Sequence, residues 1–248
     1  MSDTALATEE LFRDDSRRTE CDACIVAIDA RGVRLDRTVF YPQGGGQAGD
    51  AGELVRADGT RVAIADTRKG EAPGEIVHVP ADPAAIEALR VGEAVTARID
   101  WERRHRHMRF HTATHLLCAL VPHPVDGCSI TTGYARLDFH MNEPLDKEGL
   151  TAGIARLVAG SHPVRHRWIS EAELDANPAL VRSMSVQPPR GTGRVRVLEI
   201  EGVDLQPCGG THVANTAEIG AVVVKKIEKK SAMTRRVVLG FAAPPPAA

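Results

Sequence analysis

Two short pairs of metal-binding residue types, far apart in the sequence, constrain this fold more than any other feature. They are His111-Thr-Ala-Thr-His115 and Cys208-Gly-Gly-Thr-His212. Residues four apart on a helix lie on one face a turn apart, so both imidazoles of the first pair can bind one metal ion. Two glycines in the second pair allow a tight turn that brings a thiolate and an imidazole together. Each pair alone is a weak signal, and a chain that uses both must bring a helix and a loop together.

Together the two pairs supply one thiolate and three imidazoles, a donor set that suits zinc. We therefore predict one Zn²⁺ ion bound by His111, His115, Cys208 and His212, with Cys208 and His212 as the catalytic residues. The first pair lacks the glutamate of the H-E-x-x-H motif, which is the general base of many metalloproteases. This argues against peptide hydrolysis by that route.

Four protein ligands are typical of a closed structural zinc site, whereas a catalytic zinc usually keeps one position open. The sequence leaves three explanations open for a catalytic role. One ligand is weak or displaced, the metal expands its coordination, or the metal mainly positions the amino group of a substrate.

The character of the chain changes at Asp100. Before it, short β-rich segments alternate with glycine-rich turns, which is typical of a small barrel or sandwich. These segments are residues 24–28, 33–35, 38–41, 62–64, 75–79 and 94–99.

After Asp100 the sequence predicts a helix over 101–121, with Asp100 as its cap and Pro122 as its stop. A second helix is expected over 146–160, and the capping box Ser170 to Glu173 opens a short third one. Strands are expected at 195–200, 220–227 and 236–241. The predicted fold class is α+β, with a long helix packed on an antiparallel sheet. The predicted domains are a glycine-rich β-barrel (1–98), a zinc-binding domain (99–241) and a disordered tail (242–248).

Composition places limits on compartment and partners. The 248 residues are 43% hydrophobic and carry a formal net charge of −2, so global charge gives no argument for nucleic acid, and no DNA partner is expected. The N-terminus has no apolar core and the apolar runs are short, which predicts a cytoplasmic protein without a membrane partner. Reduced thiols are then expected. We interpret the remaining cysteines as structural: Cys21, Cys24, Cys118 on the helix and Cys128 in a loop.

Local basic clusters are the argument for RNA. Arg103, Arg104, Arg106 and Arg109, with His105 and His107, lead into the first metal pair, and Lys225, Lys226, Lys229, Lys230, Arg235 and Arg236 follow the second. A solvated surface is the simpler interpretation of any one of these residues. As groups close to the metal pairs they favour phosphate binding. The predicted RNA contacts are Arg103, Arg104, Lys225, Lys226, Lys229 and Arg235.

Three stretches in this order, HTATHLL, RLDFH and CGGTHV, resemble the editing domain of alanyl-tRNA synthetase and its free-standing AlaX relatives. FYPQGGGQAGD, residues 40–50, resembles the glycine-rich motif of the small β-barrel domain that precedes the editing domain. The resemblance covers roughly residues 8–241. It leaves no room for the aminoacylation domain, so it is to the free-standing class.

This resemblance implies zinc ligands at the same four residues and hydrolysis of mischarged tRNA(Ala) without ATP. Seryl-tRNA(Ala) would be the main substrate and glycyl-tRNA(Ala) a second. It also places Gly45, Gly46 and Gln47 beside the substrate. The synthetase editing domain carries a glutamine before its R-x-D-F element, and residues 125–129 here contain none. Selectivity must therefore come from other groups, and the Thr131 and Thr132 hydroxyls are candidates for pairing with a serine side chain.

Two other functions fit the same residues. One is a zinc hydrolase of small amides or peptides that uses the same ligand set. The other is a non-catalytic tRNA-binding module in which a closed zinc site only stabilises the fold. Activity on small substrates without RNA would favour the first, and tight tRNA binding without deacylation would favour the second.

Overall fold

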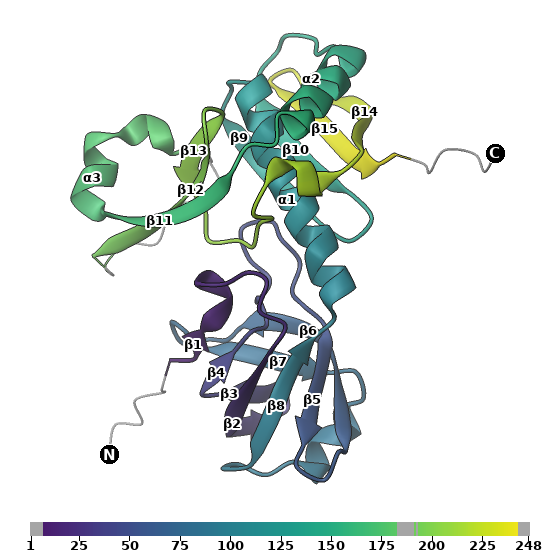
Figure 1. Cartoon of the computed structure of the whole chain (residues 1–248), viewed down its shortest axis with the longest axis vertical. Coiled ribbons are helices and arrows are strands. Elements are labelled where there is room, and N and C mark those ends of the chain that lie inside the picture. Colours follow the sequence, from purple (N-terminus) through teal and green to yellow (C-terminus); the bar gives the residue numbers. More distant parts are fainter. Residues whose placement is uncertain (1–6, 183–190, 192, 243–248) are drawn as a thin grey trace, which may run out of the picture. The chain divides into compact units, whose positions relative to one another are not determined.

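The structure, a computed structural model, describes residues 7–182, 191 and 193–242, which fall into two compact units (Figure 1). The first unit comprises residues 1–44 and 48–105, and the second comprises 45–47 and 106–248. The division falls inside helix α1 (Trp101–Leu120), a few residues after the predicted boundary at 98/99. The predicted tail, 242–248, lies outside the described residues except for Ala242.

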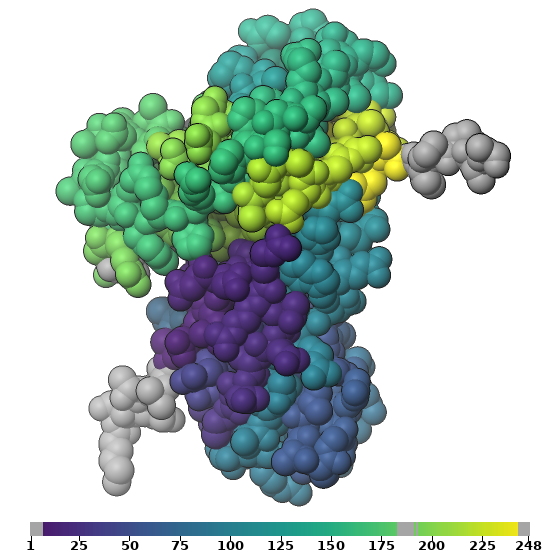
Figure 2. Space-filling view, in the orientation of Figure 1, coloured from purple at the N-terminus to yellow at the C-terminus, as the bar shows by residue number. Residues whose placement is uncertain are grey.

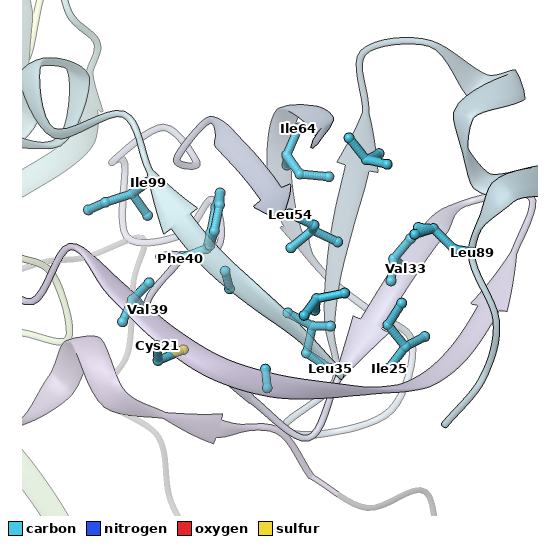
Figure 3. Close-up of a cluster of buried hydrophobic side chains, with 14 residues drawn as sticks. Cys21, Ile25, Val33, Leu35, Val39, Phe40, Leu54, Ile64, Leu89 and Ile99 are labelled. Carbon is cyan, nitrogen blue, oxygen red and sulfur yellow. The ribbon is translucent and has the colours of Figure 1, made fainter. Parts of the chain in front are cut away.

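The first unit is a closed barrel of antiparallel strands, which confirms the predicted barrel. In spatial order its strands are β2 (Glu20–Asp29), β3 (Gly32–Leu35), β7 (Ile76–Pro80), β6 (Arg61–Lys69), β5 (Gly52–Arg56) and β8 (Ala94–Ile99). Alternate residues point inward, so the interior fills with side chains such as Ile25, Leu35 and Leu54, all fully buried (Figure 3). Short elements complete the unit: β1 (Glu9–Glu10), β4 (Arg37–Thr38) and the 3₁₀ helices η1 (Leu11–Arg13) and η2 (Pro83–Ala88).

The strand expected over 38–41 is wrong beyond Thr38. The amide of Phe40 donates to the Thr38 hydroxyl at 3.0 Å, and the amide of Tyr41 donates to the Asp50 carboxylate at 2.7 Å. Side chains thus take the place of a neighbouring strand as partners of this backbone. Strand β5 was not predicted, because Leu54 is its one buried residue and a single apolar position gives little periodicity.

The second unit contains two antiparallel sheets. One has the order β14 (Val222–Ser231), β15 (Thr234–Phe241), β10 (Ala135–His140), β9 (Val125–Ile130), and the other β11 (Val164–Ser170), β12 (Arg194–Ile200), β13 (Asp204–Pro207). Helix α2 (Lys147–Ala159) packs on β14, and α1 stacks Phe110 on Phe241 of β15 with ring centroids 4.1 Å apart. Helix α3 (Glu171–Ala176) covers the second sheet, and η3 (Pro178–Leu180) and η4 (Thr216–Ile219) are 3₁₀ turns. These sheets and helices confirm the α+β class.

Local signals at the helix ends are confirmed. The Asp100 carboxylate accepts from the amide of Arg103 at 3.0 Å, and both hydrogen bonds of the Ser170–Glu173 capping box are present. The position predicted for Cys128 is wrong, because it lies within β9 rather than in a loop. Strands β9, β10, β11 and β13 were not predicted. None of the helices in the described part of the chain is long and apolar enough to cross a membrane.

Candidate metal centre

The two predicted pairs meet in the second unit. His111 and His115 lie on α1, Cys208 directly follows β13, and His212 lies in the loop after it. One donor atom from each residue lies within 4.8 Å of the others. The Cys208 sulfur is 3.5 Å from Nε2 of His111 and 3.2 Å from Nε2 of His212. This arrangement can hold one metal ion.

Each of the three imidazoles has a hydrogen-bond partner on the nitrogen that faces away from the centre. Nδ1 of His111 lies 2.7 Å from Oε1 of Gln47. The side-chain nitrogen of Gln47 donates to the Thr211 hydroxyl at 2.9 Å. The side-chain oxygen of Gln47 also accepts from the backbone amide of Thr211 at 3.2 Å. Because the Gln47 oxygen is an acceptor, His111 must donate from Nδ1 and present its Nε2 lone pair to the centre.

The other two imidazoles are oriented in the same way. Nδ1 of His115 lies 2.8 Å from the Asp204 carboxylate, and Nδ1 of His212 lies 3.2 Å from the Thr112 hydroxyl. That hydroxyl donates to the carbonyl of Met108 at 3.0 Å, so it accepts from His212. All three rings therefore offer Nε2, the form that zinc binds, and the donor set fits the predicted ion.

The loop that carries Cys208 is fixed by a buried arginine. Arg196 on β12 donates through Nη1 to the carbonyls of Cys208 at 2.8 Å and Gly210 at 3.1 Å, and its own carbonyl accepts from the Cys208 amide at 3.1 Å. A Cβ atom on Gly210 would overlap the His111 ring. Glycine at this position is thus required for the close approach of loop and helix.

The charges of the centre favour a cation. Burial alone would raise the pKa of Cys208, but the nearby His111 and His212 and its hydrogen bonds lower this pKa well below the usual value. Burial lowers the pKa of His212, helped by the charge of His111. For His115 burial also lowers the pKa, but the hydrogen bonds to Asp204 and Cys208 outweigh it and raise the pKa to about 10. A thiolate and a buried carboxylate therefore hold positive charge here, either a proton or a metal ion.

The predicted glycine-rich segment lies beside β9. The Gly46 carbonyl accepts from the Ile130 amide at 2.7 Å, and Gln47 pairs with Ile130 in a parallel bridge. Gly46 has φ +86°, and a Cβ there would lie 2.7 Å from the Cys128 sulfur. Gln47 is fully buried behind His111, so the structure gives it a contact with a ligand that the sequence did not predict. Substrate contact by Gly45, Gly46 and Gln47 stays a prediction.

The two predicted threonines lie in the turn between β9 and β10. The Thr131 hydroxyl donates to the Tyr134 carbonyl at 3.1 Å and accepts from the Gly133 and Tyr134 amides at 3.2 Å. The carbonyl of Thr132 accepts from Nε of Arg106 at 2.8 Å. Thr131 thus uses its hydroxyl to hold the turn.

Two of the predicted RNA contacts need correction. Arg104 is fully buried, where its guanidinium pairs with Asp50 and donates to the carbonyls of Val39 at 2.6 Å and Ser16 at 2.9 Å. Arg235 is also buried and donates to the carbonyls of Asn142 and Ser231. Both guanidinium groups thus donate to backbone carbonyls of their own unit, and the fully buried Arg104 is not available to a phosphate.

The other predicted cations are accessible to different degrees. Lys225, Lys226 and Lys229 are exposed along β14, and the Lys226 ammonium pairs with Glu228 at 2.6 Å. Arg103 is half-buried and donates to the carbonyl of Gly49 through Nε at 3.1 Å and Nη2 at 2.9 Å. RNA contact by these four residues stays a prediction.

Comparison with known proteins identifies the family. Residues 195–238 match the "Threonyl and Alanyl tRNA synthetase second additional domain", and residues 7–103 match "tRNA synthetases class II (A)". The chain is 34% identical to alanyl-tRNA editing protein AlaX-M of Methanosarcina acetivorans and 36% identical to that of Saccharolobus solfataricus. Each alignment covers 93% of this chain and 97% of the relative.

The full-length synthetase is a partial match. The chain is 34% identical to the alanine–tRNA ligase of Pyrococcus furiosus, and the alignment covers 93% of this chain but 25% of the ligase. Relatives of the editing class, by contrast, align over almost their entire length. The chain therefore belongs to the AlaX-M family of alanyl-tRNA editing proteins.

Proposed function

We propose that this protein hydrolyses the ester of mischarged tRNA(Ala) in trans. Seryl-tRNA(Ala) is the main substrate and glycyl-tRNA(Ala) the second, and one Zn²⁺ ion is the cofactor. The observation that carries the proposal is the group of His111, His115, Cys208 and His212, in which the three histidines are buried and every imidazole presents Nε2 to the same point. Membership of the AlaX-M family supports the choice of tRNA(Ala).

Zinc bound here would supply a positive charge that polarises an ester carbonyl and lowers the pKa of a water molecule. The protein's own part is to hold the four donors rigidly. Gln47, Asp204 and Thr112 fix the three rings, and Arg196 fixes the Cys208 loop. A site held this firmly aligns a bound ester without reorganising, which is a large part of enzymatic rate enhancement.

Selectivity for serine follows from hydrogen bonding. A pocket that pairs with the serine hydroxyl rejects alanine, because alanine leaves a buried polar group unpaired. Of the two threonines predicted for this role we favour Thr132, since Thr131 uses its hydroxyl within the turn. The Thr132 carbonyl is tied to α1 through Arg106, five residues before His111, or about 8 Å along the helix.

RNA binding is assigned to the exposed lysines of β14 and to Arg103. Lys225, Lys226 and Lys229 project from one strand of the unit that carries the metal centre. Phosphates are neutralised by such exposed cations. Gly45 and Gly46, next to Gln47, are proposed to lie beside the bound acceptor end.

The decisive experiment is deacylation of purified seryl-tRNA(Ala), with alanyl-tRNA(Ala) as the control substrate. The zinc-loaded protein should remove serine and spare alanine. Cys208→Ala should abolish the reaction, while Cys24→Ala in the barrel strand β2 should not. Circular dichroism of both variants checks that a loss of activity is not a loss of fold.

Other outcomes would replace the proposal. Tight tRNA binding without cleavage of either ester by zinc-loaded protein would select the non-catalytic binding module, which the four-ligand site favours. Cleavage of small amides in the absence of RNA would select the small-amide hydrolase.

A further inference from the structure

Strand β11 carries an exposed tryptophan. The Trp168 side chain is 38% exposed, although large aromatic side chains are usually buried. The guanidinium of Arg194 lies 4.4 Å from the centre of its ring. Figure 2 shows the segment with β11 and α3 at the surface of the second unit (green, left). A cation stacked on an exposed indole is a surface suited to a flat, anionic ligand.

Strand register places Trp168 in line with the metal centre. Trp168 is paired with Arg196 across β11 and β12. Val197 is paired with Pro207, and the Cys208 amide donates to the Arg196 carbonyl, so Cys208 is opposite Arg196. Directly opposite residues project from the same face of a sheet. With strands about 4.8 Å apart, Trp168 and Cys208 are separated by roughly 10 Å on one face.

The opposite face of this sheet is a hydrophobic core. Ile169, Val195 and Val197 pack there against Leu174 of α3. Because side chains alternate along a strand, Trp168 and Arg196 must project from the other face. That second face also holds Asp204, the partner of His115. Asp204 pairs with Ile200, and Ile200 lies an even number of residues from Arg196 on β12, so all three point to the same face. The tryptophan and the metal centre thus share one face.

The charge of that face favours an anionic ligand. On β11 and β12 it carries His166, Trp168, Arg194 and Arg196 and no carboxylate. The acidic residue of these two strands, Glu199, is paired with Arg165 on the opposite face. Next to the stacked base a phosphodiester would meet the guanidinium of Arg194. The nearest carboxylates are engaged, because Asp204 is paired with His115 and Glu171 accepts from the Gly191 and Gly193 amides.

We propose that Trp168 and Arg194 form the platform on which a base of the single-stranded 3′ end of the tRNA stacks while its ester reaches the metal centre. This inference rests on the proposed function and names the subsite that holds the RNA end. Unpaired bases are recognised by stacking on aromatic rings and guanidinium planes.

Trp168 can report this contact directly. The chain has two tryptophans, so the Trp101→Phe variant leaves Trp168 as the single indole fluorophore. Uncharged tRNA(Ala) should quench its emission, because a stacked base quenches indole. The same tRNA without its single-stranded 3′ nucleotides should bind without quenching. Equal quenching by both RNAs, or binding of the intact RNA without quenching, would overturn the proposal.

Kinetics supply the second test. Trp168→Ala should raise the KM for seryl-tRNA(Ala) about 5- to 150-fold, the range found for removal of one aromatic–base stack, with a smaller change in kcat. Trp168→Phe should retain most of the affinity. Val91→Ala, which truncates an exposed apolar side chain in the first unit, is the matched control and should leave KM unchanged.

The two tests separate failure of the platform from failure of the proposed function. Quenching by the intact RNA end without deacylation would keep the platform and reject the hydrolase. Deacylation with an unchanged KM in Trp168→Ala would reject the platform. If that variant instead changed the oligomeric state with KM unchanged, the surface would be a contact between copies of this chain, and the proposal would fall.

Discussion

His115 donates from Nδ1 to the buried carboxylate of Asp204 across 2.8 Å, and this pair joins the long helix to strand β13. The carboxylate also accepts from the side-chain amide of Gln206 at 2.7 Å. A carboxylate partner makes an imidazole a stronger metal ligand and fixes its tautomer. Asp204 thus sets the strength of one of the four predicted zinc ligands.

Asp204→Asn should lower zinc affinity about 10- to 100-fold, the usual effect of losing an outer partner of a metal ligand. The asparagine has a similar shape, so the fold should persist. Competition with a chelator would measure the affinity. Glu199→Gln, an exposed change on the neighbouring strand β12, should leave it unaltered. Equal affinities in wild type and Asp204→Asn would show that the pair does not tune the metal.

Gln47→Leu should weaken zinc binding and deacylation together. Leucine cannot accept from Nδ1 of His111, and it leaves the buried Thr211 amide without its acceptor. Gln47→Glu keeps an acceptor for both groups and should restore most of the zinc affinity. Zinc affinity and kcat/KM should be measured for each variant. An increase of KM in Gln47→Leu at unchanged zinc affinity would instead support the direct substrate contact that the sequence suggested.

The sequence reveals residues whose pattern is local, and it hides partners that lie far apart along the chain. The spacing of His111 and His115 is a property of one helix, and the turn at Cys208 is a property of one loop, so both are visible locally. Asp204 lies 89 residues from His115, and Gln47 lies 64 residues from His111. No local pattern links such residues, and only the folded chain shows that they are partners.

The same limit applies to charge and to strands. Arg104 stands in a basic run that suggested RNA, but its partner Asp50 is 54 residues away. The basic run alone does not show that Arg104 is buried. Strand β9 was missed because Gly127, Cys128 and Ser129 in its middle break the alternation that marks a half-buried strand. The capping box at Ser170 is visible in the sequence, because it depends on residues only three apart.

Arg104→Met should destabilise the protein by about 3–5 kcal/mol, because it leaves the Asp50 carboxylate buried without its partner. Urea unfolding would measure the loss. At a temperature where the variant is folded, the salt dependence of tRNA binding should equal that of the wild type. A smaller salt dependence would return Arg104 to the RNA contacts.

Lys225→Ala and Lys229→Ala should show the opposite behaviour. Both side chains are exposed, so the free energy of unfolding should change by less than about 0.5 kcal/mol. If each contacts a phosphate, the slope of log Kd against log salt should fall by about one or less per residue removed. Glu102→Gln, an exposed change of charge at the start of α1, is the comparison. Unchanged slopes in both lysine variants would remove β14 from the RNA surface.

We expect the free energy of unfolding to fall in mild acid, because the imidazole of His78 is buried in the barrel. The ring is fully buried, lies 3.1 Å from the Val33 carbonyl through Nδ1, and lies 2.8 Å from the Thr38 hydroxyl through Nε2. Burial lowers the pKa of His78 from 6.5 to about 4, although the hydrogen bond to Val33 opposes this shift. Between these values the unfolded chain binds the proton and the folded chain does not. The stabilisation is therefore complete above pH 6.5 and is lost as the pH falls towards 4.

At pH 5 this difference amounts to about 2 kcal/mol less stability than at pH 7. His78→Gln removes the titrating group, so its loss of stability between pH 7 and pH 5 should be smaller than that of the wild type by about this amount. Urea unfolding of the zinc-loaded proteins at the two pH values would measure it. Zinc ligands titrate alike in both proteins and cancel in the comparison. A wild-type pH dependence in His78→Gln would refute the assignment.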